Sequence, residues 1–214
     1  MREYIRKHRR EYTHDLLDEA NVDRDPYRQF ENWLEVAFKA ELPDPHAMVL
    51  ATVSRDGRPS ARVVLLRDLD AKGIIFYTNY DSRKGLELAA NPHASAVFFW
   101  QELDRQVRVE GTVEKITEAE SDKYFRSRPR ESQISAWASA QSTMIDSRAQ
   151  LDALFEKFKN EFRNKSVPRP PNWGGLRLCP DRFEFWQGRP NRLHDRIKYQ
   201  LIDTNRWELS RLAP

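Results

Sequence analysis

The chain has 214 residues, of which 39% are hydrophobic and 32% are charged, and its formal net charge at pH 7 is +3. Eleven Phe, seven Tyr and six Trp are too many aromatic side chains for a disordered chain, so we expect a soluble globular protein. The single cysteine, Cys179, excludes an internal disulfide framework and a multi-cysteine zinc site, and we predict no metal site.

Membrane, export and nucleic-acid signals are missing from the sequence. The longest purely apolar run covers residues 96–100, whereas a membrane-spanning helix needs roughly 18 residues. Residues 1–10 lack the apolar core of a secretory signal. We therefore expect a cytoplasmic protein with no membrane partner. Nucleic-acid binding is the weakest alternative, because the basic residues interleave with acidic ones and no nucleic-acid motif occurs.

The N-terminal part predicts an arm followed by a helix. We expect residues 1–25 to form a basic arm and residues 26–214 to form a single domain. Asp25 followed by Pro26 is typical of an N-cap and first helical position, so a helix should run to about Leu42. Its apolar positions recur at helical spacing and predict a buried stripe of Phe30, Trp33, Leu34, Ala37 and Phe38.

The rest of the chain predicts mainly strands. Asp56-Gly57 is a hairpin turn signal, and Thr117 with Glu120 forms a capping box at a helix start. We predict helices at 82–90, 117–128 and 146–162, and strands at 48–54, 60–67, 73–79, 94–100, 106–116, 175–186, 193–202 and 207–212. Antiparallel strands with peripheral helices favour a closed β-barrel, and the absence of Gly-x-Gly-x-x-Gly agrees with excluding a doubly wound sheet.

Two basic clusters point to anion binding. Arg83 and Lys84 begin a predicted helix, where cations oppose the helix dipole unless an anion binds there. The alternative is a solvated basic turn. Arg62 and Arg67 are five residues apart, so a regular strand would direct them to opposite faces and different partners. Their alternative is to be rim arginines that cap the ends of a strand.

Two further clusters have the same character. Tyr124 and Arg128 share a helix face, and Ser132 is expected to cap the segment after Pro129, which makes a plausible phosphate cradle. An exposed helix end is the alternative. In a strand, Arg192, His194 and Arg196 would share one face, where three basic groups favour a ligand. A lone His is more often a structural residue.

The motifs as an ordered set resemble the pyridoxine/pyridoxamine 5′-phosphate oxidase family over residues 9–214, almost the whole chain. The last two motifs together are especially specific. The matching segments are Arg-Arg-Glu-Tyr (9–12), Arg-Val-Val-Leu-Leu (62–66), Phe-Tyr-Thr-Asn (76–79), Ser-Arg-Lys (82–84), Arg-Gln-Val-Arg-Val-Glu-Gly (105–111), Tyr-Phe-x-Ser-Arg-Pro (124–129), Ser-Gln-Ile (132–134), Gln-Ser (141–142), Trp-Gly-Gly (173–175), Glu-Phe-Trp-Gln-Gly (184–188) and Arg-Leu-His-Asp-Arg (192–196).

This resemblance implies a fold and a reaction. The fold would be mainly β with peripheral helices, an FMN-binding split β-barrel of the antiparallel Greek-key type, assembled as a homodimer. The reaction would be oxidation of pyridoxine 5′-phosphate or pyridoxamine 5′-phosphate to pyridoxal 5′-phosphate. Hydride would pass from the substrate C4′ to the flavin, and molecular oxygen would reoxidise the flavin and give hydrogen peroxide, with ammonia released from the amine.

The resemblance also implies site residues by matching position. Arg192 and His194 would be catalytic. FMN contacts would come from Arg62, Val63, Val64, Leu65, Leu66, Tyr77, Thr78, Arg83, Lys84, Gln106, Gln141, Ser142, Trp186 and Arg196. Substrate contacts would come from Arg9, Tyr12, Arg67, Tyr124, Arg128, Ser132, Arg192 and His194.

One position departs from the pattern, and two other functions compete. Position 67 is usually Lys in the family and is Arg here, which keeps the charge on a larger, planar group and should preserve phosphate binding.

One competitor is a related barrel oxidase, such as a phenazine-pathway oxidase. The other is a non-catalytic FMN or pyridoxal-phosphate binding protein. The Tyr124/Arg128/Ser132 cluster argues against the first, and residues 192–196 argue against both.

Overall fold

The computed structural model describes residues 11–12, 16–204 and 206–214, which fall into two compact units. The first unit contains the described residues up to Val49 together with Ser95–Glu110 and Pro180–Pro214. The second contains Leu50–Ala94 and Gly111–Cys179. The predicted division into an arm and one domain at residue 25 stays a prediction. No helix in the described part of the chain is long and apolar enough to cross a membrane.

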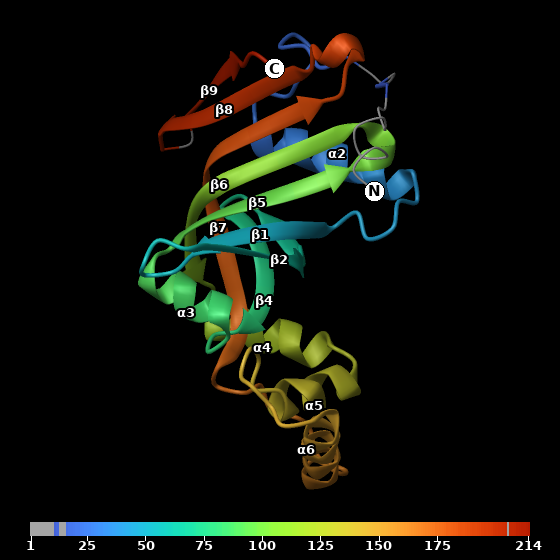
Figure 1. Cartoon of the computed structure of the whole chain (residues 1–214), viewed down its shortest axis with the longest axis vertical. Coiled ribbons are helices and arrows are strands. Elements are labelled where there is room, and N and C mark those ends of the chain that lie inside the picture. The colour runs from blue at the N-terminus through green and yellow to red at the C-terminus, as the bar shows by residue number, and fades with distance from the viewer. Residues whose placement is uncertain (1–10, 13–15, 205) are drawn as a thin grey trace, which may run out of the picture. The chain divides into compact units, whose positions relative to one another are not determined.

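Strands make up most of the described elements, as the sequence predicts (Figure 1). The strands are β1 (Ala47–Val53), β2 (Pro59–Leu65), β3 (Asp68–Asp70), β4 (Gly73–Asn79), β5 (His93–Trp100), β6 (Arg105–Lys115), β7 (Trp173–Gln187), β8 (Asp195–Asp203) and β9 (Arg206–Arg211). Their hydrogen-bonded order is β2-β1-β5-β6-β7-β4-β3, and β8 pairs with β7 and β9. The helices are α2 (Pro26–Lys39), α3 (Arg83–Ala90), α4 (Glu118–Ser127), α5 (Arg130–Ala138) and α6 (Arg148–Glu161), with short 3-10 turns η1 (Gln101–Leu103) and η2 (Pro190–Arg192).

In the first unit, α2 packs its aromatic face against strands. The Asp25 side chain accepts a hydrogen bond from the Tyr27 amide, and Pro26 occupies the first turn, as the sequence predicts. Phe30 packs 4.8 Å from Phe98 between ring centroids, and Trp33 meets Phe185 edge-on at 5.3 Å. The predicted stripe is too wide at its end, because Phe38 in the last turn is 51% exposed.

In the second unit, β4 is a largely buried strand. It pairs antiparallel with β3 and with the first part of β7, from Ile74 opposite Leu178 to Asn79 opposite Trp173. The turn after β1 contains Gly57 at φ +83°, which confirms the turn predicted from Asp-Gly. Because β4 ends where α3 begins, Thr78 and Asn79 stand next to the start of that helix.

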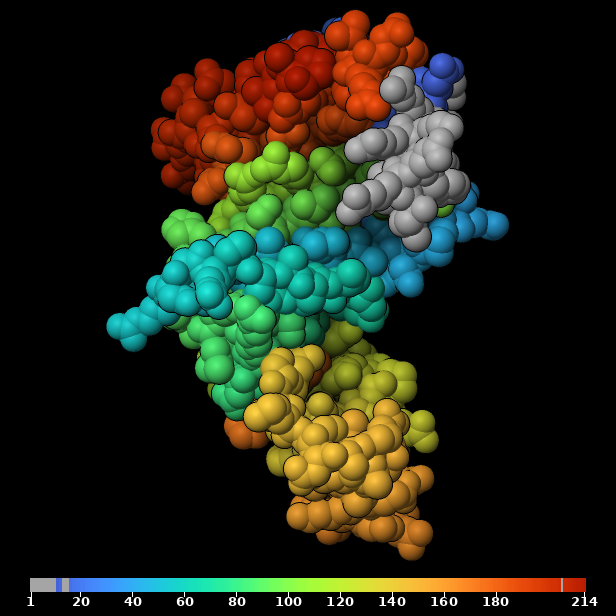
Figure 2. Space-filling view, in the orientation of Figure 1, coloured from blue at the N-terminus to red at the C-terminus, as the bar shows by residue number. Residues whose placement is uncertain are grey.

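The helices of the second unit lie within a few residues of their predicted positions, with one exception. Thr117 and Glu120 form the predicted capping box of α4. The sequence does not predict α5, since Pro129 indicates only the end of α4, whereas in the structure it is also the N-cap of α5. Phe125, Ile134 and Trp173 join a small buried cluster that holds this helix. Figure 2 shows α6, coloured yellow to orange, on the surface of its unit, and none of its 14 residues is buried.

Candidate functional site

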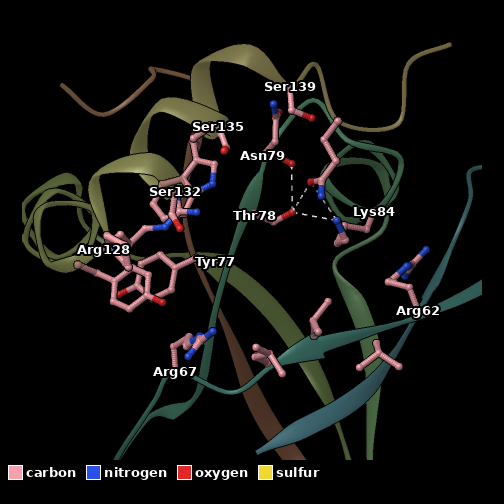
Figure 3. A pocket seen from close by; sticks show the side chains of 18 of the residues that line it. Arg62, Arg67, Tyr77, Thr78, Asn79, Lys84, Arg128, Ser132, Ser135 and Ser139 are labelled. Atoms are coloured by element: carbon pink, nitrogen blue, oxygen red, sulfur yellow. Dashed lines mark hydrogen bonds between the residues drawn. The ribbon is translucent and has the colours of Figure 1, made fainter. Parts of the chain in front are cut away.

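The second unit contains a cavity of about 850 Å³ that is lined by polar, cationic and aromatic side chains (Figure 3). It lies where the ends of β2 and β4, the start of α3, the end of α4 and one face of α5 meet. The lining residues are Arg62, Val63, Val64, Leu65, Arg67, Tyr77, Thr78, Asn79, Lys84, Tyr124, Ser127, Arg128, Pro129, Ser132, Ser135, Ala136, Ser139, Gln141 and Trp173. The cavity therefore brings together twelve of the residues that the resemblance implies for two different ligands.

Lys84 places a buried ammonium group in the wall of this cavity. Its side chain lies in the first turn of α3, and the residue is 8% exposed. Nζ donates to Thr78 Oγ1 at 2.9 Å, to Gln141 Oε1 at 3.2 Å and to Ser82 Oγ at 3.4 Å. Burial lowers the pKa of Lys84, and the charge of Arg62 lowers it further. No carboxylate among the described residues pairs with this ammonium, so this side of the cavity suits an anion.

Arg128 supplies a second cation without a counter-ion. Its guanidinium carbon lies 4.6 Å from the centroid of the Trp173 ring. Nη1 is buried and has no hydrogen-bond partner among the described residues. Burial lowers the pKa of Arg128, Tyr124 opposes that shift, and the charge of Arg67 adds to it. Two guanidinium groups that repel each other and face one cavity suit a dianionic ligand group such as phosphate.

Stacked aromatic rings line the cavity on the side of Arg128. Tyr77 and Tyr124 stack with centroids 3.7 Å apart, and Tyr77 lies 5.5 Å from Trp173 at an interplanar angle of 14°. Burial, together with the neighbouring Tyr124, raises the pKa of Tyr77 to about 12, so the phenol stays protonated at neutral pH. The cavity therefore offers flat aromatic surface together with two anion-binding regions, which suits an aromatic compound that carries phosphate.

The structure changes the expected geometry of Arg62 and Arg67. Because β2 ends at Leu65, the alternation of a regular strand does not reach Arg67, and both side chains line the cavity. Figure 3 shows Arg62 on the side of Lys84 and Arg67 on the side of Arg128. Arg62 already pairs with Glu87, at 3.2 Å between Nη2 and Oε2. Arg62 is therefore charge-compensated, unlike Lys84.

Several predicted residues lie elsewhere in the second unit. Arg83 begins α3 as predicted, but its Nε pairs with Glu87 Oε1 at 2.9 Å and it does not line the cavity. Leu66 is buried in the core, and Ser142 is exposed at φ +74°. Ser132 lies inside α5 and lines the cavity, so the prediction that it caps a helix is wrong.

Sequence reasoning missed seven of the lining residues. Four of these fall inside family motifs without an implied role: Asn79, Ser127, Pro129 and Trp173. Pro129 indicated only a helix end. Ser135 and Ser139 follow Ser132 at three- and seven-residue intervals, which puts them on one face once α5 is known. That spacing was the available signal, but it could not be recognised because the sequence did not predict α5. The remaining missed residue is Ala136.

A second group of predicted residues gathers in the first unit. Tyr12 meets Trp186 edge-on at 5.7 Å and His194 at 5.1 Å, and Trp186 lies 4.7 Å from His194 between ring centroids. His194 Nδ1 accepts a hydrogen bond from the Arg189 amide at 3.1 Å. Burial lowers the pKa of His194, and Arg192 lowers it further, so the ring is neutral at pH 7. Because Nδ1 is an acceptor, the neutral ring carries its proton on Nε2.

The prediction that Arg192, His194 and Arg196 share one face of a strand is wrong. β8 begins only at Asp195, and Asn191 and Arg192 adopt φ +55° and +62°, which no strand allows. Arg196 lies opposite Trp186 in the β7–β8 pairing and forms an ion pair with Glu184 at 3.0 Å. Glu184 therefore neutralises the charge of Arg196, whereas the sequence pattern predicted that a ligand would do so.

Two other predicted residues need separate mention. Gln106 lies in β6 of the first unit and is half-buried. Arg9 lies outside the described residues. Among the residues that the structure describes, no three His, Cys, Asp or Glu side chains are grouped so that they could hold a metal ion.

Comparison with known proteins gives consistent matches over the chain. Residues 34–161 match the pyridoxamine 5′-phosphate oxidase family, and residues 173–214 match the pyridoxine 5′-phosphate oxidase C-terminal dimerisation region. A pyridoxine/pyridoxamine 5′-phosphate oxidase from Methylibium petroleiphilum is 56% identical over 214 residues, covering 100% of both chains.

Solved structures show the same fold. The crystal structure of PhzG from Burkholderia lata in complex with tetrahydrophenazine-1-carboxylic acid has a TM-score of 0.87 and 33% identity, covering 94% of this chain and 99% of that one. A pyridoxamine 5′-phosphate oxidase-related, FMN-binding protein from Nostoc punctiforme has a TM-score of 0.71 at 17% identity, covering 90% and 100%. The predicted fold class, the mainly antiparallel split-barrel class with peripheral helices, is confirmed.

Proposed function

Because the chain belongs to the pyridoxamine 5′-phosphate oxidase family, we propose that it oxidises pyridoxine 5′-phosphate or pyridoxamine 5′-phosphate to pyridoxal 5′-phosphate with FMN as cofactor. Molecular oxygen is the final acceptor and leaves as hydrogen peroxide. The alcohol loses two hydrogens, and the amine also takes up water and releases ammonia. The observation that carries this proposal is the pair of cations without counter-ions, Lys84 and Arg128, in one cavity beside stacked aromatic rings.

The residues of the cavity fit a phosphate-bearing flavin. A volume of about 850 Å³ lies within the range of about 300–1,000 Å³ typical of small-molecule sites. Lys84 would hold the flavin phosphate, since its partners Thr78 and Gln141 leave its charge uncompensated. FMN, when bound, supplies the redox chemistry by accepting a hydride equivalent from the substrate C4′.

The other cationic region would hold the substrate phosphate. Arg128 offers its unpartnered Nη1, Arg67 adds a second guanidinium, and Ser132 and the Tyr124 phenol can donate hydrogen bonds. Binding through the remote phosphate orients the reacting carbon without direct chemistry at that end. This assignment favours a phosphorylated substrate over tetrahydrophenazine-1-carboxylic acid, the compound in the PhzG structure, whose name indicates a carboxylic acid and no phosphate.

Arg192 and His194 remain the proposed catalytic groups, and the first unit limits what His194 can do. The neutral ring presents Nε2–H as a donor, so His194 would hold an acceptor atom of the substrate rather than remove a proton through Nδ1. Arg192 cannot act as a base, because a guanidinium group keeps its proton in proteins. Both residues would therefore orient the substrate ring and polarise its substituents.

The proposal also covers assembly and location. The match to a C-terminal dimerisation region supports a homodimer. We place the protein in the cytoplasm, where a chain with one cysteine needs no disulfide. Trp186, Arg196, Gln106, Tyr12, Arg9 and the segment 62–66 keep the ligand roles that the family resemblance implies.

The test is an aerobic assay of the purified, FMN-reconstituted protein. Both phosphorylated substrates are compared with unphosphorylated pyridoxine and with tetrahydrophenazine-1-carboxylic acid, while pyridoxal 5′-phosphate and peroxide are measured. The proposal predicts equal amounts of product and peroxide from the phosphorylated vitamers alone. Turnover of the phenazine compound without turnover of the vitamers would move the function to a related oxidase. Tight flavin binding without any turnover would favour a binding protein.

A further inference from the structure

A buried carboxylate beside the cavity has no role in the proposed reaction. Glu87 lies in α3, four residues after Arg83, and is only 6% exposed. Glu87 does not line the cavity, but it contacts two arginines with proposed roles there. Arg62 lines the cavity, and Arg83 is assigned to FMN by the family resemblance. A buried acid is retained only with strong compensation, so its partners show what it does.

Glu87 is a hydrogen-bond acceptor for four donors. Oε2 accepts from the hydroxyl groups of Thr52 and Ser60 and from Arg62 Nη2 at 3.2 Å. Oε1 accepts from Arg83 Nε at 2.9 Å. Burial raises the pKa of Glu87, but these four hydrogen bonds outweigh it and lower the pKa to about 2. Glu87 is therefore a permanent negative charge at every physiological pH.

Glu87 compensates the charge of Arg62, but other groups also hold the Arg62 side chain in place. Nη1 of Arg62 donates to the Leu50 carbonyl at 3.1 Å and to Thr52 Oγ1 at 2.6 Å, and Nη2 also donates to Ser60 Oγ. These three neutral acceptors remain when Glu87 is replaced by Gln. Glu87 is the one carboxylate paired with Arg62 among the described residues, so the change removes the compensating charge and leaves most of the geometry.

The side of the cavity around Lys84 and Arg62 carries more positive than negative charge. Arg62 and Lys84 line the cavity, Arg83 lies just outside it at the start of α3, and Glu87 offsets one of these three positive charges. The charge of Arg62 is felt at Lys84, where it lowers the ammonium pKa after burial. The remaining two charges match a phosphate monoester, which carries about −1.5 to −2 at pH 7. Without Glu87, the cavity would hold Arg62 and Lys84 with no carboxylate to offset either charge while the site is empty.

We propose that Glu87 is the built-in counter-ion of this phosphate-binding wall: it stabilises the protein while the phosphate position is empty and thereby limits the affinity for phosphate. The inference rests on the proposed function only in taking FMN as the natural phosphate ligand. By linkage, a change that destabilises the empty protein more than the loaded one must tighten binding by the same factor.

The test uses Glu87→Gln in the full-length apoprotein, with thermal unfolding as the readout. We expect the Tm of the variant to lie at least about 5 °C below wild type, because an uncompensated, partly buried Arg62 charge is costly. Saturating FMN should close most of this gap, and inorganic phosphate should narrow it. Riboflavin, which lacks the phosphate, should leave the gap unchanged. FMN affinity of the variant, measured by flavin fluorescence, should rise about tenfold.

Asp152→Asn is the matched control, since Asp152 is an exposed carboxylate in an i, i+4 pair with Arg148 on α6. It should change neither the Tm nor its response to phosphate. A Tm gap for Glu87→Gln that FMN and riboflavin close equally, an apoprotein as stable as wild type, or weakened FMN binding would each overturn the proposal.

A second variant tests the proposal even if the Glu87→Gln protein does not fold. The double variant Arg62→Gln/Glu87→Gln removes both charges and should recover most of the lost Tm. A double variant no more stable than Glu87→Gln would contradict the counter-ion role. None of these measurements needs turnover, so a failed oxidase assay and a failed counter-ion test are separate results.

Discussion

Basic side chains gather in both units, but they are balanced differently. In the first unit, Arg196 pairs with the buried Glu184, and Arg211 pairs with Glu19 and Asp195. In the second unit, Lys84 has only neutral partners and Arg128 has a buried nitrogen without any, among the residues that the structure describes.

The difference teaches how to separate structural cations from ligand-binding ones. A cluster of Arg and Lys in the sequence does not distinguish them, because the compensating carboxylate can be distant in sequence. Glu184 stands 12 residues before Arg196, and Glu19 stands 192 residues before Arg211. The informative feature is the missing acidic partner, which appears only in three dimensions.

The largest expected effect comes from removing the buried ammonium group of Lys84 in the second unit. Lys84→Met keeps the apolar stem and deletes the charge, so we expect FMN affinity to fall about 100-fold, within the range for truncating a buried charge pair. Riboflavin affinity, measured in the same fluorescence titration, should change little. Loss of both affinities alike would mean that Lys84 supports the fold rather than the phosphate.

A smaller effect is expected at the other cationic region. Arg128→Met should raise the KM for pyridoxine 5′-phosphate roughly 30-fold with near-normal flavin content, since it removes a charged hydrogen-bond donor from the substrate phosphate. Arg128→Lys should recover part of the loss. Steady-state kinetics with matched flavin occupancy provide the measurement, and an unchanged KM would exclude this residue from the substrate site.

In the first unit, a charge deletion should affect stability alone. Arg211→Met removes ion pairs to Glu19 and Asp195 and a hydrogen bond to the Leu17 carbonyl. These groups are partly exposed, so a small loss of stability is expected, with a Tm shift of no more than about 2–4 °C. Inorganic phosphate should not restore the Tm, in contrast to the Glu87→Gln protein. Restoration by phosphate would place an anion site in the first unit.

The smallest effect concerns the protonation of His194. Burial and the charge of Arg192 lower the pKa of His194, so Arg192→Gln should raise it. A lowered pKa means stability that is present above the unfolded value of about 6.5 and is lost as the pH falls through the folded pKa, so the variant should lose less stability in acid. An NMR titration of the His194 ring checks the shift, and an unchanged or lower pKa would contradict the contact.

Local signals predicted the fold well. The N-cap Asp25, the capping box at Thr117 and the turn at Gly57 all lie where side-chain chemistry puts them. The predicted strands are confirmed within a few residues, apart from the short β3, which was missed. These elements depend on neighbours in sequence, which is why they could be predicted.

The errors come from features set by distant contacts. The apolar residues of α5 form no clear helical stripe, and the helix is held by a cluster that includes Phe162 and Trp173. The positive φ of Arg192 broke the predicted strand face, and it has no marker such as Gly in the sequence. Likewise, Glu87 meets Arg62 across 25 residues of chain, so the charge balance of the cavity could not be read from either motif alone.

The central claim is that the uncompensated cations of the second unit bind phosphate. The most direct measurement is a paired titration of the wild-type apoprotein with FMN and with riboflavin, two ligands that differ only in the phosphate. The account predicts that FMN binds at least about 100-fold more tightly, as expected for a charged hydrogen-bonded pair in a buried site. Equal affinities for the two flavins would contradict it.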